Sequence, residues 1–119
     1  MTTPVSKGVI TELFAEQYLT QQGLVPVTKN FRCRLGEIDL IMRDGNTYVF
    51  IEVKFRKNSV FGGAISAISA NKMNKIKHTA TFYLHQAGLN EYNTACRIDV
   101  IALEGNINKP SINWLKNAF

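Results

Sequence analysis

The stretch GEIDLIMRDGNTYVFIEVKFR, residues 36–56, constrains the fold more than any other part of the chain. Two runs rich in β-branched, aliphatic and aromatic residues flank the dipeptide Asp44-Gly45, which is a strong β-hairpin signal. Because side chains alternate across a strand, Ile38 and Leu40 are expected to share the core-facing side of the first run. The stretch therefore predicts two adjacent antiparallel strands at the heart of a sheet.

Charged residues interrupt both predicted strands at alternate positions. By the same alternation, Glu37 and Asp39 share one face of the first strand, and Glu52 and Lys54 share one face of the second. Acids are disfavoured in strands, and like charges opposite each other destabilise a sheet. Sheet pairing alone therefore gives no reason to gather three carboxylates here, whereas a bound cation does.

The register of the hairpin decides whether the two charged faces coincide. We expect a two-residue loop at the Asp-Gly dipeptide, which pairs Arg43 with Asn46. In this register Asp39 is a diagonal neighbour of Glu52, with Cβ atoms at most about 7–8 Å apart. A divalent ion with ligand distances of about 2.0–2.6 Å can bridge carboxylates at that spacing. A loop with an odd number of residues would put the two acids on opposite faces.

Simpler interpretations of the same residues stay open at this point. The acids could be solvent-facing groups on a half-exposed sheet, and Lys54 could be an ion-pair partner of Glu52 or Glu37. Asp99 lies in another apolar strand, where it either joins the site or, as we favour, forms hydrogen bonds in the core near Arg97.

Helices and strands around the hairpin complete the predicted fold. The expected elements are a helix over residues 7–22 capped by Ser6, a β-like segment over residues 24–34, the hairpin strands over residues 37–42 and 47–55, a helix capped by Ser66 or Ser69 and ending near residue 87, a strand over residues 97–103, a turn-rich connection over residues 104–110, and an apolar tail over residues 112–119. Pro26 suits an edge strand. This order predicts one α/β domain over residues 1–119, in which helices flank a mixed central sheet.

Glu12 is a further candidate because of its place on the first predicted helix. It lies on the stripe formed by Gly8, Ala15 and Leu19, and not with Glu16, which is expected to face solvent. From this stripe its carboxylate could reach the acidic face of the sheet.

Basic residues outnumber acidic ones, and their distribution indicates an anionic partner. The 119-residue chain has a formal net charge of +5 at pH 7, which makes nucleic acid and a membrane surface the candidates. Nine basic residues fall in three clusters: Lys29, Arg32 and Arg34; Lys54, Arg56 and Lys57; and Lys72, Lys75 and Lys77. Taken singly, each cluster could equally be a solvated face.

Other features of the chain bear on its location. No apolar run approaches the roughly 20 residues that a membrane span needs. The N-terminal residues lack the charged and apolar regions of a signal peptide. Cys33 and Cys96 lie far apart and match no zinc-binding spacing. We therefore expect a cytoplasmic protein with reduced thiols and no membrane segment.

The charged hairpin resembles the motif of the PD-(D/E)XK nuclease superfamily, with Asp39 on one strand and Glu52-Val53-Lys54 on the next. The predicted order of elements resembles its restriction-endonuclease-like αβββαβ core. Ile38 stands where the superfamily name has proline, which is a common departure. The whole chain is similar to the YraN-like family of small bacterial endonuclease-like proteins, which resemble Holliday-junction resolvases in fold. The matching segments include Gly8 with Glu12 and Ala15, Asn30-Phe31-Arg32, Gly36–Ile41, Val49–Lys54 with Arg56, Phe61-Gly62, Lys72, Arg97–Val100 and Asn117–Phe119.

This resemblance implies a role for each matching residue. Asp39 and Glu52 would bind Mg²⁺ or Mn²⁺, together with the carbonyl of Val53. Lys54 would orient or help deprotonate the attacking water and offset charge on the phosphate. Glu12 would complete the site or bind a second ion. Glu37 is an accessory candidate, as an outer-sphere ligand or a water acceptor.

The resemblance leads to the hypothesis of a metal-dependent endonuclease that hydrolyses phosphodiester bonds in DNA, which could be branched or damaged. The residues expected to contact the nucleic acid are Arg32, Arg34, Arg56, Lys57, Lys72 and Lys75. The alternative is a nucleic-acid-binding module of the same fold with little or no turnover, and nothing in the sequence separates DNA from RNA. A homodimer, which paired cuts in a junction would need, could form through the apolar tail, or the tail could pack on its own sheet.

Overall fold

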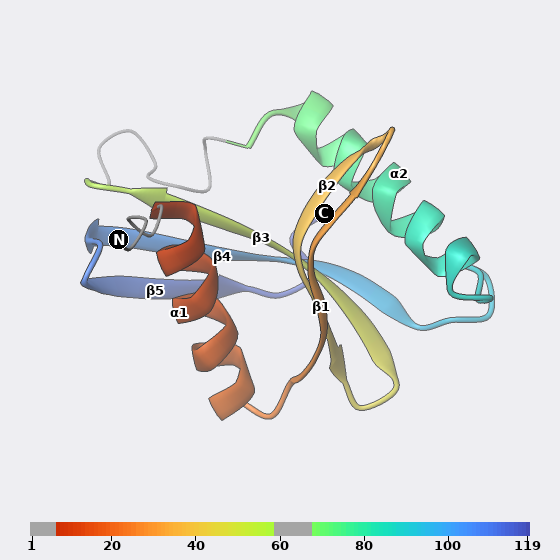
Figure 1. Ribbon diagram of the computed structural model, residues 1–119, viewed down its shortest axis with the longest axis horizontal. Coiled ribbons are helices and arrows are strands. Elements are labelled where there is room, and N and C mark those ends of the chain that lie inside the picture. Colours follow the sequence, from red (N-terminus) through yellow and green to blue (C-terminus); the bar gives the residue numbers. More distant parts are fainter. Residues whose placement is uncertain (1–6, 59–67) are drawn as a thin grey trace, which may run out of the picture.

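In the computed structural model, which describes residues 7–58 and 68–119, five strands form one mixed sheet between two helices (Figure 1). The elements follow in the order α1 (Lys7–Gln21), β1 (Val25–Cys33), β2 (Gly36–Asp44), β3 (Thr47–Arg56), α2 (Ala70–Gln86), β4 (Cys96–Asn106) and β5 (Lys109–Leu115). The strands lie in the sheet in their chain order; β3 and β4 run parallel, and the other neighbours run antiparallel. The crossover that a parallel pair requires contains α2. The predicted αβββαβ core is confirmed.

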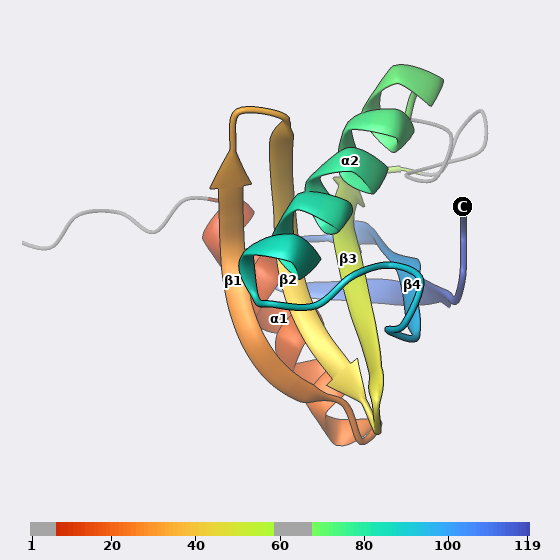
Figure 2. The same ribbon diagram turned by 90° about the vertical axis from the view of Figure 1, so that its right-hand side faces the viewer.

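The two helices cover opposite faces of the sheet, with α2 in front of it and α1 behind it in Figure 2. On the α1 side, Ala15 and Leu19 pack against apolar residues of β2, β3 and β4. On the α2 side, Ile76 and Leu84 pack around Phe50, which is fully buried. Burial of each large side chain stabilises the fold by about 1.5–3 kcal/mol. The central strands are thus fixed from both sides.

The helix boundaries are close to the predicted ones. α1 is followed by Gly23, whose φ of +101° is a conformation that glycine adopts readily. α2 begins after Ser69, whose side chain accepts a hydrogen bond from the backbone N–H of Lys72 at 3.1 Å. The other predicted caps, Ser6 and Ser66, lie outside the described residues. Neither α1 nor α2 is long and apolar enough to cross a membrane.

The hairpin between β2 and β3 differs from the predicted register. Asp44 pairs with Thr47, so the two-residue loop is Gly45-Asn46 and not Asp44-Gly45. Gly45 has a φ of +62°, which is what glycine adopts at the first central position of a type II′ turn. The pairing is shifted by two residues, and a shift of two keeps the faces of the two strands in their predicted relation.

Strand β2 changes the face that it presents to the core at Asp39. Leu40 packs on the α1 side of the sheet, whereas Ile38 packs on the α2 side. The prediction that these two residues share a face is therefore wrong. The change lies beside an irregular point of β1, where Asn30 has a left-handed φ of +54°. Local twisting of the β1–β2 pair accounts for the difference, because the alternation of residues along a strand does not predict such twisting.

Pro26 and the C-terminal tail both lie in edge strands of the sheet, β1 and β5. β1 is an edge strand, as predicted, and its register with β2 shifts next to Pro26. The tail pairs with β4 as strand β5, and Trp114 packs on the α1 side of the same sheet. The predicted turn-rich connection over residues 104–110 is wrong, because β4 runs to Asn106 and β5 starts at Lys109. The side chain of Asn106 accepts a hydrogen bond from the N–H of Asn108 at 2.9 Å, which closes this tight turn.

Candidate active site

The candidate site lies where β2 and β3 separate. Their ladder pairs end at Leu40 with Ile51, and the next position of the register places Asp39 opposite Glu52. Here the backbone N–H of Val53 donates a hydrogen bond to Oδ2 of Asp39 at 2.8 Å. The Asp39 side chain thus provides the acceptor for a backbone donor of β3. In the structure the two carboxylates are directly opposite each other in the register, whereas the sequence predicted that they would be diagonal neighbours.

Asp39 and Glu52 are neighbouring carboxyl groups, and the pKa of each is raised. Glu52 is 3% exposed, and burial together with the adjacent Asp39 raises its pKa to about 7. Burial also raises the pKa of Asp39, although the hydrogen bond from Val53 opposes this shift. Both carboxyl groups are therefore easier to protonate in the folded protein than in the unfolded chain when no cation is bound. Near neutral pH the pair can therefore exchange a proton for a cation.

Two lysines from different elements balance the charge of Glu52. Lys54 Nζ lies 3.6 Å from Oε1 of Glu52, and Lys72 Nζ lies 3.7 Å from the same oxygen. Lys54 follows the acid on β3, whereas Lys72 comes from the first turn of α2. Their side chains are 28% and 40% exposed, so both also face solvent. Lys72, which was predicted to contact nucleic acid, thus lies in the site itself.

Glu12 lies on α1, and its carboxylate interacts electrostatically with Asp39. Burial and the Asp39 carboxylate raise the pKa of Glu12, and a hydrogen bond from the Asn30 side chain opposes the shift. Asn30 was not predicted as a site residue. The sequence offers one indication of its position, an asparagine within a predicted strand, because asparagine adopts the left-handed region more readily than most residues. Its partner, Glu12, could not be identified without the structure.

Glu37 lies at the rim of the site. Its Oε2 lies 3.3 Å from Nε of Arg32, and both side chains are more than one third exposed. Such a pair contributes at most about 1 kcal/mol to stability. The charge of Glu37 nevertheless raises the pKa of both Asp39 and Glu12. Glu37 is therefore part of the electrostatic environment of the site while it stays in contact with solvent.

Five of the six predicted nucleic-acid-binding residues lie on three segments that border the upper side of the molecule in Figures 1 and 2. Arg32 and Arg34 lie at the end of β1 and in the turn that follows it, Arg56 ends β3, and Lys72 and Lys75 lie in the first half of α2. All five are exposed or half-exposed. The carboxylates of β2 and β3 lie between segments that carry positive charge.

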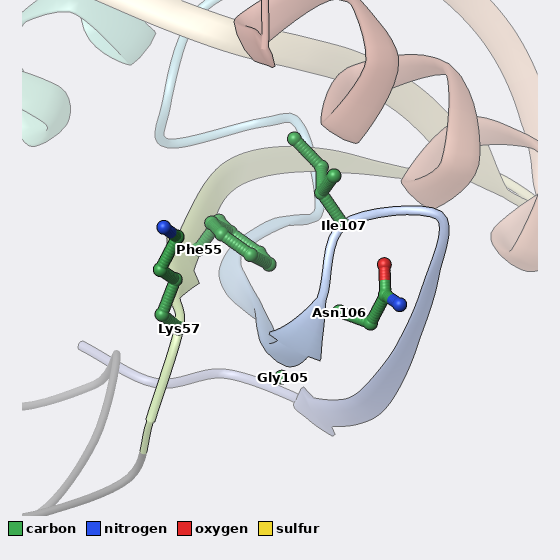
Figure 3. Close-up of a pocket in the computed structure, with 5 residues that line it drawn as sticks. All are labelled: Phe55, Lys57, Gly105, Asn106 and Ile107. Atoms are coloured by element: carbon green, nitrogen blue, oxygen red, sulfur yellow. The ribbon is translucent and has the colours of Figure 1, made fainter.

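The sixth residue, Lys57, lies elsewhere. It lines a pocket of about 350 Å³ together with Phe55, with Gly105 and Asn106 at the end of β4, and with Ile107 in the turn that follows (Figure 3). Phe55 packs against the α1-side core, whereas Glu52 lies on the other face of β3. This pocket is therefore separate from the carboxylates, and none of these five lining residues is acidic.

Asp99 belongs to a different network, as we favoured from the sequence. It is fully buried and accepts hydrogen bonds from Nε of Arg97 at 3.1 Å, from Nε1 of Trp114 at 2.9 Å and from the backbone N–H of Asn117 at 2.8 Å. Arg97 also donates from Nη1 to Asp44 at 3.1 Å. This network ties β4 to β5 and to the hairpin, and its role is structural.

The donor set of the site fits a hard divalent cation that also binds water and substrate oxygens. Within residues 7–58 and 68–119, no three Asp, Glu, His or Cys side chains are grouped so that they could hold an ion by themselves. Mg²⁺ usually binds through only one or two carboxylates, several waters and substrate phosphates. Asp39 and Glu52 meet that requirement, and an all-oxygen set favours Mg²⁺ or Mn²⁺. The Val53 carbonyl as a ligand stays a prediction, since the contact found uses its N–H.

Known proteins match the chain along most of its length. Residues 11–103 match the family described as "Uncharacterised protein family UPF0102". A UPF0102 protein of Colwellia psychrerythraea is 64% identical, over 99% of this chain and 92% of the relative. Relatives of the same name from Aeromonas hydrophila and Yersinia pestis are 49% and 44% identical, over 96% and 94% of this chain and 85% and 92% of the relatives. These matches confirm the predicted resemblance to the YraN-like family.

Proposed function

We propose that this chain, which belongs to protein family UPF0102, is a divalent-metal-dependent endonuclease of the PD-(D/E)XK type that hydrolyses phosphodiester bonds in DNA. The observation that carries the proposal is a pair of adjacent carboxylates, the half-buried Asp39 and the buried Glu52, which Lys54 and Lys72 balance where β2 and β3 separate. Two like charges side by side, one of them buried, destabilise a fold. A cation that binds both carboxylates gives a functional reason to keep them.

The residues on the two strands have separate tasks in this reaction. When bound, Mg²⁺ or Mn²⁺ supplies positive charge to the scissile phosphate and lowers the pKa of a bound water. Asp39 and Glu52 hold the ion, and the Val53 N–H keeps the Asp39 carboxylate in place. Lys54 orients the attacking water and offsets negative charge on the phosphate.

The two remaining acids act from the edge of the pair. Glu12, held by the Asn30 side chain, completes the site from α1 or helps to bind a second ion. Glu37 faces solvent beside Arg32, where it can accept a hydrogen bond from an ordered water. Neither residue replaces the Asp39–Glu52 pair in this proposal.

The basic segments around the carboxylates support a nucleic acid as the substrate class. Arg32, Arg34, Arg56, Lys72 and Lys75 can contact phosphates without reading bases, so binding is expected to be salt-dependent and largely sequence-independent. Branched and damaged DNA are included among the substrates to be tested, because the superfamily that the chain resembles contains junction resolvases. A homodimer, if paired cuts require one, needs a surface other than the tail face that packs on its own sheet.

The test is divalent-dependent cleavage of linear, nicked, flapped and four-way DNA, with EDTA as the metal-free control. The wild type is compared with Glu52→Gln and with Glu91→Gln, an acid that pairs with His85 at the surface beyond α2. We expect the wild type and Glu91→Gln to cut equally, and Glu52→Gln to be slower by at least about 100-fold. The proposal is wrong if the wild type cuts none of these substrates, or if Glu52→Gln cuts as well as the wild type.

A nucleic-acid-binding module without turnover is the second candidate. Lys54 and Lys72 compensate Glu52 without any ion, which would suit a site that no longer binds one. This function predicts salt-sensitive DNA binding that survives Asp39→Ala, and no Mn²⁺ binding by calorimetry. Cleavage and calorimetry together separate the two candidates.

A further inference from the structure

We propose that Lys72 takes the place of the divalent cation while no ion is bound, and that it moves to the substrate phosphate when the ion arrives. The inference rests on the proposed nuclease function and deepens it. It assigns to Lys72 two alternating partners, the Glu52 carboxylate and a phosphate of DNA. A surface lysine that only binds nucleic acid would need no contact with Glu52.

The first step is the position of the Lys72 ammonium group. It lies 3.7 Å from Oε1 of Glu52, whose side chain is almost fully buried where β2 and β3 separate. The ammonium group thus places a positive charge beside Glu52, one of the two carboxylates that a bound ion would contact.

The second step is that Lys72, and not Lys54, is free to leave. Lys54 lies two residues beyond Glu52 on the same strand, so the strand fixes its backbone relative to the acid. Lys72 reaches the acid from α2 and is the more exposed of the two, at 40% against 28%. At 3.7 Å the contact is an ion pair and not a short hydrogen bond, so little directional bonding is lost when it opens.

The third step is that helix stability does not explain a lysine at this position. The first turn of α2 contains no acid, and a cation there is unfavourable beside the positive end of the helix dipole. Ser69 already caps the turn by accepting the backbone N–H of Lys72. The Lys72 side chain therefore has no capping task, and its charge is better explained by the site.

The fourth step is the charge balance. Asp39 and Glu52 carry two negative charges when both are ionised, and Lys54 and Lys72 carry two positive charges. A divalent ion added to this balanced set leaves an excess of two positive charges, which the phosphates of DNA can neutralise. Ion and DNA are therefore expected to favour each other's binding, and by linkage each raises the affinity of the other by the same factor.

The experiment compares Lys72→Met with the wild type and with Lys77→Met, which removes an exposed lysine from the same helix. Mn²⁺ affinity is measured by calorimetry, and affinity for a labelled DNA duplex is measured by anisotropy in EDTA and in Ca²⁺. We expect Lys72→Met to bind Mn²⁺ about three- to tenfold more tightly, because a competing charge is gone. We expect it to bind DNA roughly threefold more weakly in Ca²⁺ and equally well in EDTA. Lys77→Met should match the wild type in all three measurements.

Two further variants keep the test decisive if Lys72→Met does not fold. Lys72→Gln should behave as described for Lys72→Met, and Lys72→Arg, which keeps the charge, should stay close to the wild type. The inference is overturned if Mn²⁺ affinity is unchanged or weaker without the Lys72 charge, or if DNA affinity falls equally in EDTA and in Ca²⁺. Absence of Mn²⁺ binding in the wild type and in every variant would instead reject the metal site, and with it the proposed function.

Discussion

Asp99 on β4 and the Asp39–Glu52 pair on β2 and β3 are carboxylates within the same sheet, but their surroundings differ. Asp99 accepts hydrogen bonds from two side chains and one backbone N–H, all within 3.2 Å. The Asp39–Glu52 pair has one short backbone hydrogen bond, from Val53, and two ion pairs longer than 3.5 Å. A carboxylate whose acceptor sites are filled by hydrogen bonds has a structural role, whereas a pair with few short hydrogen bonds can still bind a cation.

The largest expected effect concerns Asp99. Asp99→Ala leaves the buried part of Arg97 without its main partner and removes the acceptor of Trp114. We expect the free energy of unfolding to fall by about 3–5 kcal/mol. Urea unfolding measures this loss. A loss below about 1 kcal/mol would show that the network is not the structural tie inferred here.

Glu52→Gln should shift stability in the opposite direction. The folded pKa of Glu52, about 7, lies above its ordinary value of 4.5, so the folded protein binds more protons than the unfolded chain between these values. The contribution of Glu52 to stability therefore falls as pH rises through this window. Without divalent ions, we expect Glu52→Gln to be more stable than the wild type by about 1–3 kcal/mol at pH 8, and equal to it at pH 4. Urea titrations at both pH values check the sign, and a variant less stable than the wild type at pH 8 contradicts it.

Addition of Mg²⁺ should stabilise the protein through the Asp39–Glu52 pair and not through Asp99. The ion competes with protons for Asp39 and Glu52, whose pKa values are both raised, so its stabilising effect should be larger at pH 8 than at pH 6. At ten times Kd we expect a gain of about 1.4 kcal/mol in the free energy of unfolding. The rise in Tm on Mg²⁺ addition provides the measurement, and Glu52→Gln is the control that should show little rise. An equal rise in both proteins would place the ion elsewhere.

The smallest effect is expected at Asn30, which holds Glu12 from a left-handed backbone position. Asn30→Ala should lose about 1 kcal/mol, because alanine tolerates this φ less well, whereas Asn30→Gly should keep near-wild-type stability. Both variants lose the hydrogen bond to Glu12, so both should raise the pKa of Glu12 further. Carboxyl carbon NMR titration of Glu12 separates this electrostatic role from the backbone role. An unchanged pKa in both variants would remove Asn30 from the site.

The sequence predicted the features that depend on local signals. The alternation of Glu52 and Lys54 with apolar residues, the proline of the edge strand and the serine cap of α2 each depend on a few neighbouring residues. Asp99 was assigned correctly to the core, because Arg97 lies on the same side of the same strand two residues away. These features needed no knowledge of how the helices pack.

Features that depend on contacts between distant elements were not predictable in the same way. The choice between two overlapping turn dipeptides set the register, and the twist at Asp39 moved Ile38 to the other face. The contact of Lys72 with Glu52 and the hydrogen bond of Asn30 to Glu12 each join elements whose relative positions the local pattern does not define. Both belong to the site, so the sequence identified the central acids better than the residues that hold and balance them.

Trp114 gives the protein an optical probe of its own. It is the single tryptophan of the chain, its indole N–H is bonded to Asp99, and its ring meets Tyr18 of α1 edge to face at 6.3 Å. Its surroundings lie on the α1 side of the sheet, whereas Glu52 faces the other side. Its fluorescence emission should therefore follow unfolding of the sheet and stay constant when charges at the carboxylate pair are exchanged. Variants of the site can thus be checked for intact folding without any added label.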